Sequence, residues 1–126
     1  VIRSFNQNQP YDQFVTEQLA GDLLDAPSLD QQIATGLHRM NIKNNESGIN
    51  KEDYRNREIV DRVNTTGTAL LGLTIGCAQC HSHKYDPISQ SEYYQFYAFF
   101  NNAAETDIDI EGTSEERARD ESAKAA

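Results

Sequence analysis

The sequence predicts an all-α fold of about four helices. Apolar residues recur three or four positions apart along most of the chain, and no stretch alternates as a half-buried strand would. Two of the expected helices also carry a complete start signal, a serine followed three residues later by Gln or Glu: Ser28 with Gln31, and Ser89 with Glu92. At 126 residues, the chain forms one domain at most.

Two helices are expected before the middle of the chain. The first spans about 10–24, because Pro10 suits the first helical turn and an apolar face follows it. That face consists of Phe14, Val15, Leu19 and Leu23. The second begins at Ser28, and His38 lies one position away from its apolar face. This second face consists of Leu29, Ile33, Leu37 and Met40.

Two more helices are expected after a polar loop at 41–50. The third starts at Asn50 or Lys51 and runs towards Ile75. Its apolar face consists of Ile59, Val63, Leu70, Leu71 and Ile75. The fourth is a short aromatic helix over 93–100, and this density of aromatic side chains predicts that it is buried or covered by a partner.

Residues 104–126 form an acidic tail, in which Thr113 and Glu116 are suited to cap an extra helix. We therefore expect a helical domain at 1–103, followed by this tail or helix. The net charge of −9 argues against nucleic acid and anionic membranes as partners. The longest apolar-rich stretch, 69–75, is far shorter than the roughly 18 residues of a membrane span. The first residues resemble the interior of an element, so we expect a piece of a longer protein.

Cys77, Cys80 and His81 form the CxxCH pattern that attaches a c-type haem, and the chain has no other cysteine. Each thiol can form a thioether with a haem vinyl group, and the His81 imidazole then becomes the proximal axial ligand. We therefore predict one covalent haem c with the helices packed around it. Gly67, Gly72 and Gly76 suit the close approach of either a flat macrocycle or a neighbouring helix.

Two other uses of the cysteine pair stay open. Zinc needs four ligands, and Cys77, Cys80, His81 and His83 are the available set, although the adjacent pair at 80 and 81 chelates poorly. A thioredoxin-like redox pair expects α/β surroundings, whereas the residues before Cys77 indicate a helix or a loop.

The second axial ligand has three candidates, His38, Met40 and His83, and an open position is a fourth option. We favour His38, which lies at the edge of an apolar face, ahead of Met40 on that face. His83 would need a sharp chain reversal to reach the opposite side of the haem, so a hydrogen bond in its turn is the expected role. Arg62 and Lys84 are candidates to bind the haem propionates, because they flank the expected haem contacts.

Several segments resemble a planctomycete cytochrome-c-like domain family, and the most specific is CAQCHSHKYDPI at 77–88. The others are 4–14, 17–22, 33–39, 44–46, 60–66, 92–94 and 99–102. The resemblance implies haem attachment at Cys77, Cys80 and His81, and it implies export, since the family is best known as one domain of large secreted proteins. Relatives often carry Met where this chain has Ile42, which leaves His38 or Met40 for the distal role. His38 matches the family pattern.

Together these observations predict a c-type cytochrome domain that passes electrons to or from a neighbouring domain, subunit or haem, rather than an enzyme. Haem attachment requires export, so the expected location is periplasmic or extracellular. The rival predictions are a haem enzyme or sensor with an open iron site, and a zinc-stapled structural or interaction module. Self-assembly stays open.

Overall fold

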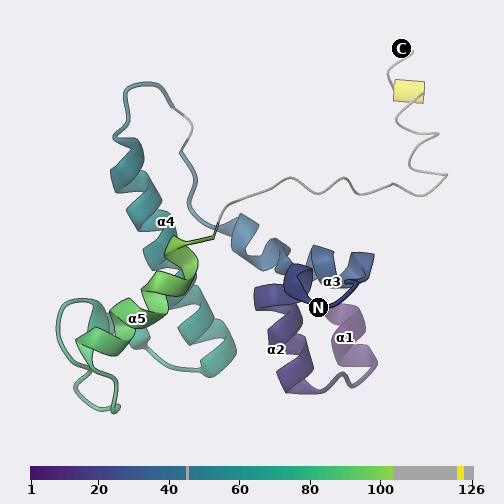
Figure 1. Ribbon diagram of the computed structural model, residues 1–126, viewed down its shortest axis with the longest axis horizontal. Helices are drawn as coiled ribbons and strands as arrows, with labels where there is room; N and C mark the ends of the chain where they lie inside the picture. Colours follow the sequence, from purple (N-terminus) through teal and green to yellow (C-terminus); the bar gives the residue numbers. More distant parts are fainter. Residues whose placement is uncertain (45, 104–121, 124–126) are drawn as a thin grey trace.

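The structure, a computed structural model, describes residues 1–44, 46–103 and 122–123. Every regular element in these residues is helical and none is a strand, so the all-α prediction is confirmed (Figure 1). The elements are α1 (Ile2–Asn6), α2 (Tyr11–Ala20), η1 (Gly21–Leu23), α3 (Leu29–Ala34), η2 (Thr35–Met40), α4 (Lys51–Thr65), η3 (Thr66–Leu70), η4 (Ile75–Gln79) and α5 (Gln90–Asn101). Here η3 is a π-helical turn and the other η elements are 3₁₀ turns.

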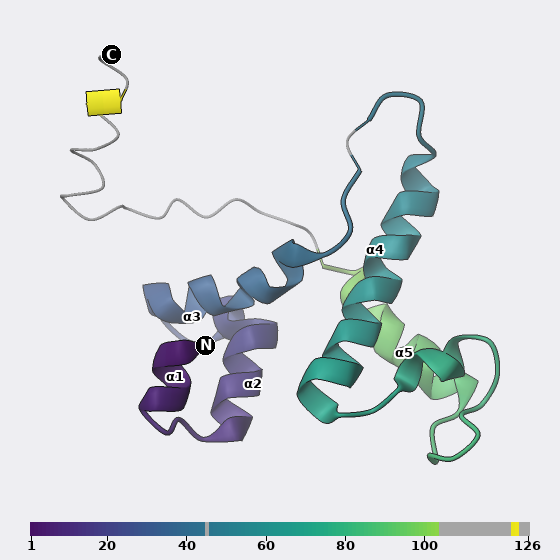
Figure 2. The same cartoon turned by 180° about the vertical axis from the view of Figure 1, so that it is seen from behind.

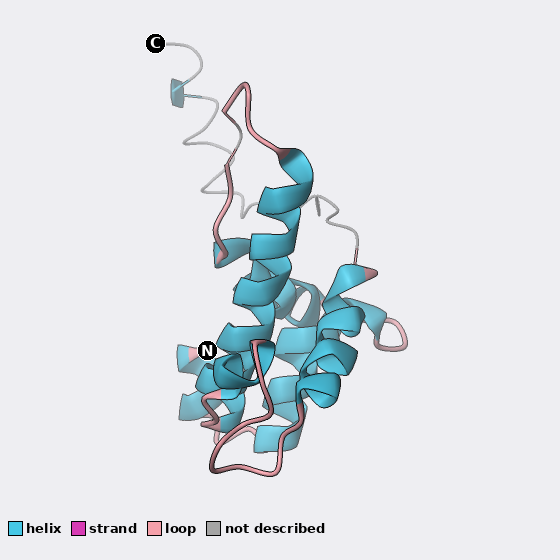
Figure 3. Ribbon diagram, turned by 90° about the vertical axis from the view of Figure 1, so that its left-hand side faces the viewer, coloured by secondary structure: helices cyan, strands magenta, loops and turns pink. Residues whose placement is uncertain are grey.

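The elements form two groups that lie side by side, as Figure 1 and the reverse view in Figure 2 both show. We call residues 2–40 the N-terminal group and residues 51–101 the C-terminal group. The chain passes from one to the other through the loop that follows η2, and Figure 3 shows this loop beyond the start of α4. Within the described residues, no helix is long and apolar enough to cross a membrane.

The N-terminal group starts with α1, which the sequence analysis did not predict. Pro10 is the N-cap of α2 rather than its first helical residue, and α2 ends at Ala20 instead of continuing to residue 24. Gly21 follows this end and lies against α3: a Cβ added there would overlap the backbone carbonyl of Gln31, so the chain comes this close to α3 only through glycine.

The predicted apolar face of the second helix is wrong. Ser28 and Gln31 do form the predicted capping box at the start of α3. However, α3 ends at Ala34 and the chain continues as the tighter turn η2, whose side chains rotate away from the α-helical stripe. Met40, at the end of this turn, is 87% exposed. Leu29 and Ile33, which lie in α3 itself, are each 45% exposed.

The third predicted helix is shorter than expected. Asn50 accepts hydrogen bonds from the backbone of the first turn, as predicted, but α4 ends at Thr65 and η3 follows it. Gly72, with a φ of +67°, then reverses the chain so that Ile75 folds back onto Gly67, where a Cβ would overlap the Ile75 side chain. The close approach at this glycine is therefore made by the chain itself.

The core lies in the C-terminal group, between α4, η4 and α5. Its buried members are Ile59, Val63, Ile75, Ala78 and Tyr93. Leu73, Ile88, Phe96, Tyr97 and Phe100 are partly buried against them. The predicted capping box of Ser89 and Glu92 starts α5, and Tyr93 of the aromatic stretch is 1% exposed. Phe99 on the same helix is 77% exposed, so only one face of the aromatic helix enters the core.

The predicted acidic tail lies almost wholly outside the described residues, and so does the proposed cap of Thr113 and Glu116. Only residues 122–123 of the tail are described, and they are helical.

Candidate functional site

The two cysteines lie on and just after the 3₁₀ turn η4. In a 3₁₀ helix, residues three positions apart share a face. Ile75 and Ala78 form one such pair and are buried in the core, whereas Cys77 and Cys80 form the other and are exposed. Both thiols are free. The local fold therefore presents two thiols together on one accessible face of a turn whose other face is anchored.

The cysteine-bearing turn is also fixed to α5 by hydrogen bonds. The carbonyl oxygen of Gln79 accepts one bond from Gln90 Nε2 at 3.1 Å and another from Tyr94 Oη at 3.0 Å. Next to this turn, Tyr93 donates to Asn64 Oδ1 on α4 at 3.3 Å. Burial, with smaller effects of Tyr94, Tyr97 and Cys80, raises the pKa of Tyr93 to about 12, so its phenol stays protonated.

The imidazole of His81 has a defined tautomer. Its Nδ1 lies 2.8 Å from the backbone oxygen of Ser82, and a carbonyl oxygen can only accept a hydrogen bond. Nδ1 therefore carries a proton, and in the neutral ring the lone pair is on Nε2. The side chain is exposed beside the two thiols. This is the arrangement in which histidine binds a metal through Nε2 while a backbone carbonyl holds its other nitrogen.

The imidazole of His83 is used inside its own loop. Nδ1 accepts hydrogen bonds from the backbone N–H groups of Tyr85 at 3.2 Å and Asp86 at 2.9 Å. Because Nδ1 accepts, the ring is neutral and Nε2–H donates to Thr74 Oγ1 at 3.3 Å. The Asp86 carboxylate, 3.3 Å from Nδ1, is therefore not an ion-pair partner. Neither nitrogen is left to bind a metal, which agrees with the expected role in the turn.

His38 lies at the junction of the two helical groups. Its ring is tilted against Phe100, with 5.1 Å between the ring centroids, and its Nε2 is buried without a hydrogen-bond partner in the described residues. Burial, and to a smaller extent the charge of Arg62, lowers the pKa of His38, so the ring is neutral at pH 7. In the amide orientation that satisfies both neighbours, Asn41 donates to the His38 oxygen at 3.2 Å and accepts from Arg62 Nε at 3.1 Å.

Cys77, Cys80 and His81 are all exposed on or just after η4, and the other predicted residues lie elsewhere. His38 and the cysteine-bearing turn contact opposite ends of α5, at Phe100 and at Tyr94, which are about 9 Å apart along the helix axis. Met40 is exposed and lines a pocket of the N-terminal group, as described below.

The two predicted propionate partners differ in their surroundings. Arg62 is buried at the junction near His38, where only 7% of the residue is exposed. Lys84 lies in the exposed loop after His81, with its Nζ 5.2 Å from the ring centroid of Tyr85. Of the two, only Lys84 is adjacent to the thiols and His81 in the chain.

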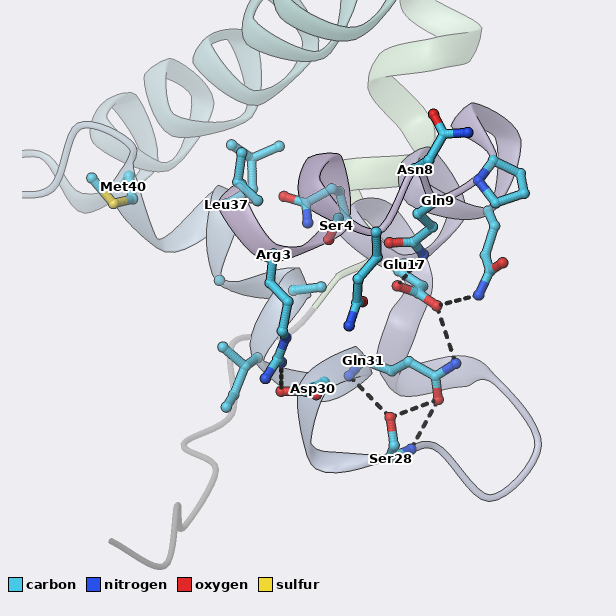
Figure 4. A pocket seen from close by; sticks show the side chains of 18 residues that line it. Arg3, Ser4, Asn8, Gln9, Glu17, Ser28, Asp30, Gln31, Leu37 and Met40 are labelled. Carbon is cyan, nitrogen blue, oxygen red and sulfur yellow. Dashed lines mark hydrogen bonds and ion pairs between the residues drawn. The ribbon is translucent and has the colours of Figure 1, made fainter. Parts of the chain in front are cut away.

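Sequence reasoning missed a pocket of about 900 Å³ between α1, α2, α3 and η2. Figure 4 shows Glu17 among the side chains that line it, with dashed lines from its carboxylate to neighbouring amides. That carboxylate accepts hydrogen bonds from the amides of Gln9 at 2.8 Å, Gln13 at 3.0 Å and Gln31 at 3.2 Å. An ion pair between Arg3 and Asp30 lies on the wall. The only sequence signal for this pocket was the high density of glutamines between residues 7 and 18. The pocket contains no residue of the cysteine-bearing turn.

The chain was compared with known protein families, curated proteins and solved structures. No curated protein and no solved structure matches the chain. Within the described residues, no group of three or more His, Cys, Asp and Glu side chains is placed to hold a metal ion. The sequence matches the family model PSCyt2, described as a protein of unknown function (DUF1549), over residues 1–105. Since this match spans most of the chain, the protein belongs to the PSCyt2 family of planctomycete cytochrome-like domains.

Proposed function

We propose that this chain is a c-type cytochrome domain that carries one covalent haem c and transfers electrons. Cys77 and Cys80 would hold the haem through thioether bonds, and His81 would bind its iron through Nε2. The observation that carries the proposal is the shared exposed face of the two free thiols, followed directly by an imidazole whose Nδ1 is bonded to a backbone carbonyl. The match to a family of cytochrome-like domains supports the same proposal.

The chemistry of the donor set fits this group. Each thiol would add across a vinyl double bond, so that a C–S bond forms and the thiol hydrogen passes to the neighbouring carbon. This requires reduced and accessible thiols, and both cysteines are free and exposed. Once bound, haem supplies one-electron Fe(III)/Fe(II) chemistry. The chain's contribution is to hold the turn: Ile75 and Ala78 anchor it in the core, and Gln79 is bonded to α5.

For the second axial position we propose His38. Because His38 and the cysteine-bearing turn contact different ends of α5, this ligation would require the N-terminal group to move towards the haem. Its Nε2 is buried and unpartnered among the described residues, and an unsatisfied polar atom of this kind requires an explanation. Its lowered pKa keeps the ring neutral, which a metal ligand must be. Met40 is the weaker candidate, because it lies on the exposed wall of the N-terminal pocket. Without a second ligand, the iron would be open and the domain would suit ligand binding or peroxide chemistry.

The proposal also gives a location and a partner. Haem attachment through thioethers is carried out after export, so we place the domain in the periplasm or outside the cell. The domain would exchange electrons with a neighbouring domain, subunit or haem. A separate redox partner with a basic surface would suit the chain's net charge of −9, because opposite charges steer association.

The test is to express the full chain in a host with haem-maturation machinery and to record the pyridine haemochrome spectrum. We expect a c-type α band that survives acid-acetone extraction, and we expect the double variant Cys77→Ser/Cys80→Ser to lose it. Met40→Leu is the matched control, since Met40 is exposed, and it should keep the band. A colourless chain of intact mass that contains zinc would reject the cytochrome and leave the zinc-stapled module.

The axial ligands are tested on the same preparation. A six-coordinate low-spin spectrum in the native chain, converted to high-spin by His38→Ala but not by Met40→Leu, would support His38 as the second ligand. A native chain that is already high-spin and binds carbon monoxide or cyanide without displacing a ligand would reject that assignment in favour of the open site.

A further inference from the structure

We propose that His83 is a positioning residue that holds the imidazole of His81 with Nε2 directed outwards. The inference deepens the proposed function and rests on it, because it concerns how the proximal histidine is oriented before any iron binds. The motif that ends at His81 gives no reason for a second histidine two residues later. The structure gives one, and it starts from the burial of His83, whose side chain is only 4% exposed.

The side chain of His83 joins two stretches of chain on either side of the cysteines. Through Nδ1 it accepts the N–H groups of Tyr85 and Asp86, and through Nε2–H it bonds to Thr74, which precedes η4. One ring therefore closes the loop from Thr74 to Asp86, and Cys77, Cys80 and His81 all lie within that loop. Because the ring is buried, these bonds do not have to compete fully with water.

The backbone of His83 connects this closed loop to His81. The peptide group between Ser82 and His83 is planar, so its C=O and N–H are fixed relative to each other. Its N–H donates to the Ile88 oxygen at 2.8 Å, and its C=O accepts the proton of His81 Nδ1 at 2.8 Å. The direction of that carbonyl therefore sets both the tautomer and the orientation of the His81 ring.

The start of α5 supports the same segment from the other side. The N–H of Gln90 lies 3.4 Å from Ser82 Oγ, and the N–H of Ile88 donates to the Asp86 oxygen at 2.7 Å. If the His83 ring lost its acceptor, Tyr85 and Asp86 would lose the partner of their N–H groups. The peptide before His83 would then be held only by its N–H bond to the Ile88 oxygen, so the carbonyl that selects the tautomer of His81 would be fixed less firmly in direction.

The test compares His83→Phe with His83→Asn in the full chain without haem, so that it does not depend on haem loading. Phe fills the buried site with a ring but has no acceptor, whereas Asn places an oxygen near the position of Nδ1. Two NMR measurements are made: amide hydrogen exchange at residues 85 and 86, and the ¹⁵N shifts that report the tautomer of His81.

We expect His83→Phe to accelerate exchange at both amides by roughly tenfold or more, since each loses its hydrogen bond. We also expect it to turn the single His81 tautomer into a mixture, and we expect His83→Asn to keep both properties close to the native ones. If His83→Phe does not fold, His83→Gln replaces it, because its longer amide also removes the acceptor from the Nδ1 position.

Two outcomes would overturn the proposal: unchanged amide exchange without the acceptor, or faster exchange with the His81 tautomer unaltered. In haem-loaded protein, the same variant should keep its covalent α band while its reduction potential shifts. Absence of the α band in the native chain would reject the proposed function, and the NMR result on the haem-free chain would still decide the role of His83.

Discussion

The N-terminal and C-terminal groups differ in how they bury their residues. The C-terminal group encloses five buried apolar residues contributed by α4, η4 and α5, and the cysteine-bearing turn is part of that core. The N-terminal group has one buried apolar residue, Phe14, and the aromatic rings beside it, Phe5 and Tyr11, are both more than half exposed. Its other buried side chain is polar, that of Gln18.

The N-terminal group is held together mainly by polar contacts, whereas the C-terminal group has an apolar core. Three glutamine amides converge on Glu17, and the capping box of Ser28 and Gln31 starts α3. Hydrogen bonds of this kind contribute about 0.5–1.5 kcal/mol each, whereas burying a large apolar side chain contributes about 1.5–3 kcal/mol. We infer that the C-terminal group is the more stable of the two and that the site depends on it.

This difference bears on the two proposed axial ligands. His81 belongs to the C-terminal group, which contains the core. His38 belongs to the N-terminal group, which has no such core. The groups meet through few contacts: Tyr11 donates to the Leu70 oxygen, and His38 packs on Phe100. If both histidines bind one iron, the bond from His38 would tie the N-terminal group to the site, and haem binding would stabilise that group by mass action.

The largest expected effect is a difference in stability between two variants, each of which truncates one isoleucine, one in each group. Ile59→Ala removes a side chain that is 3% exposed in the core, and we expect it to lower the free energy of unfolding by about 2–5 kcal/mol. Ile33→Ala acts at a residue that is 45% exposed, and we expect a change within about 0.5 kcal/mol. Urea denaturation measures both. Equal losses would mean that the N-terminal group has a core of its own.

Glycine substitutions give the next largest effect, about 1–3 kcal/mol from overpacking. Gly67→Ala would press on the side chain of Ile75, so in an Ile75→Ala background its cost should vanish. Gly21→Ala would press on the backbone carbonyl of Gln31, and no side-chain truncation should relieve it. Gly36→Ala, which meets nothing within 4 Å, is the control and should leave stability unchanged or slightly raised.

The outcome of that double-mutant cycle decides whether close packing is made by side chains in one group and by backbone in the other. If the cost of Gly67→Ala persisted without the Ile75 side chain, the glycine would be required for its backbone conformation. Thermal unfolding of the four variants, each compared with its own background, provides the measurement.

Local signals in the sequence predicted the helix starts well. Ser28, Asn50 and Ser89 all cap helices, because a cap depends on residues within three positions of one another. The end of α4 was not predicted, since Leu70, Leu71 and Ile75 continue the apolar period beyond Thr65. Only the left-handed conformation of Gly72 and the packing of Ile75 on Gly67, both tertiary features, end that run.

The candidate site was likewise predictable from the sequence only where it depends on local spacing. Spacing alone selected Cys77, Cys80 and His81, because the chemistry requires that spacing. Spacing did not predict that the cysteines share the exposed face of a 3₁₀ turn, which follows from the burial of their neighbours. It also did not predict the tautomer of His81, which depends on the direction of one carbonyl. Met40 was misjudged because a 3₁₀ turn does not keep the α-helical period.

The smallest expected effect is a pH dependence confined to the N-terminal group. Hydrogen bonds, first that from Gln9 and then that from Gln13, lower the pKa of Glu17 below its ordinary value of about 4.3. Between the lowered pKa and 4.3 the unfolded chain binds more protons, so stability falls as the pH is lowered through that range. Above it, the stabilisation by the carboxylate is fully present.

Glu17→Gln should therefore be less stable than the native chain at pH 6, and the two stabilities should converge as the pH falls towards 3. Amide exchange in α2, measured as a function of pH, reports this change. Gln9→Ala is the partner variant: its cost should depend on pH in the native chain and become independent of pH once Glu17 is replaced. Parallel pH profiles for the native chain and Glu17→Gln would show that the carboxylate is not what holds the N-terminal group together. The stability of that group would then depend on its contacts with Leu70 and Phe100.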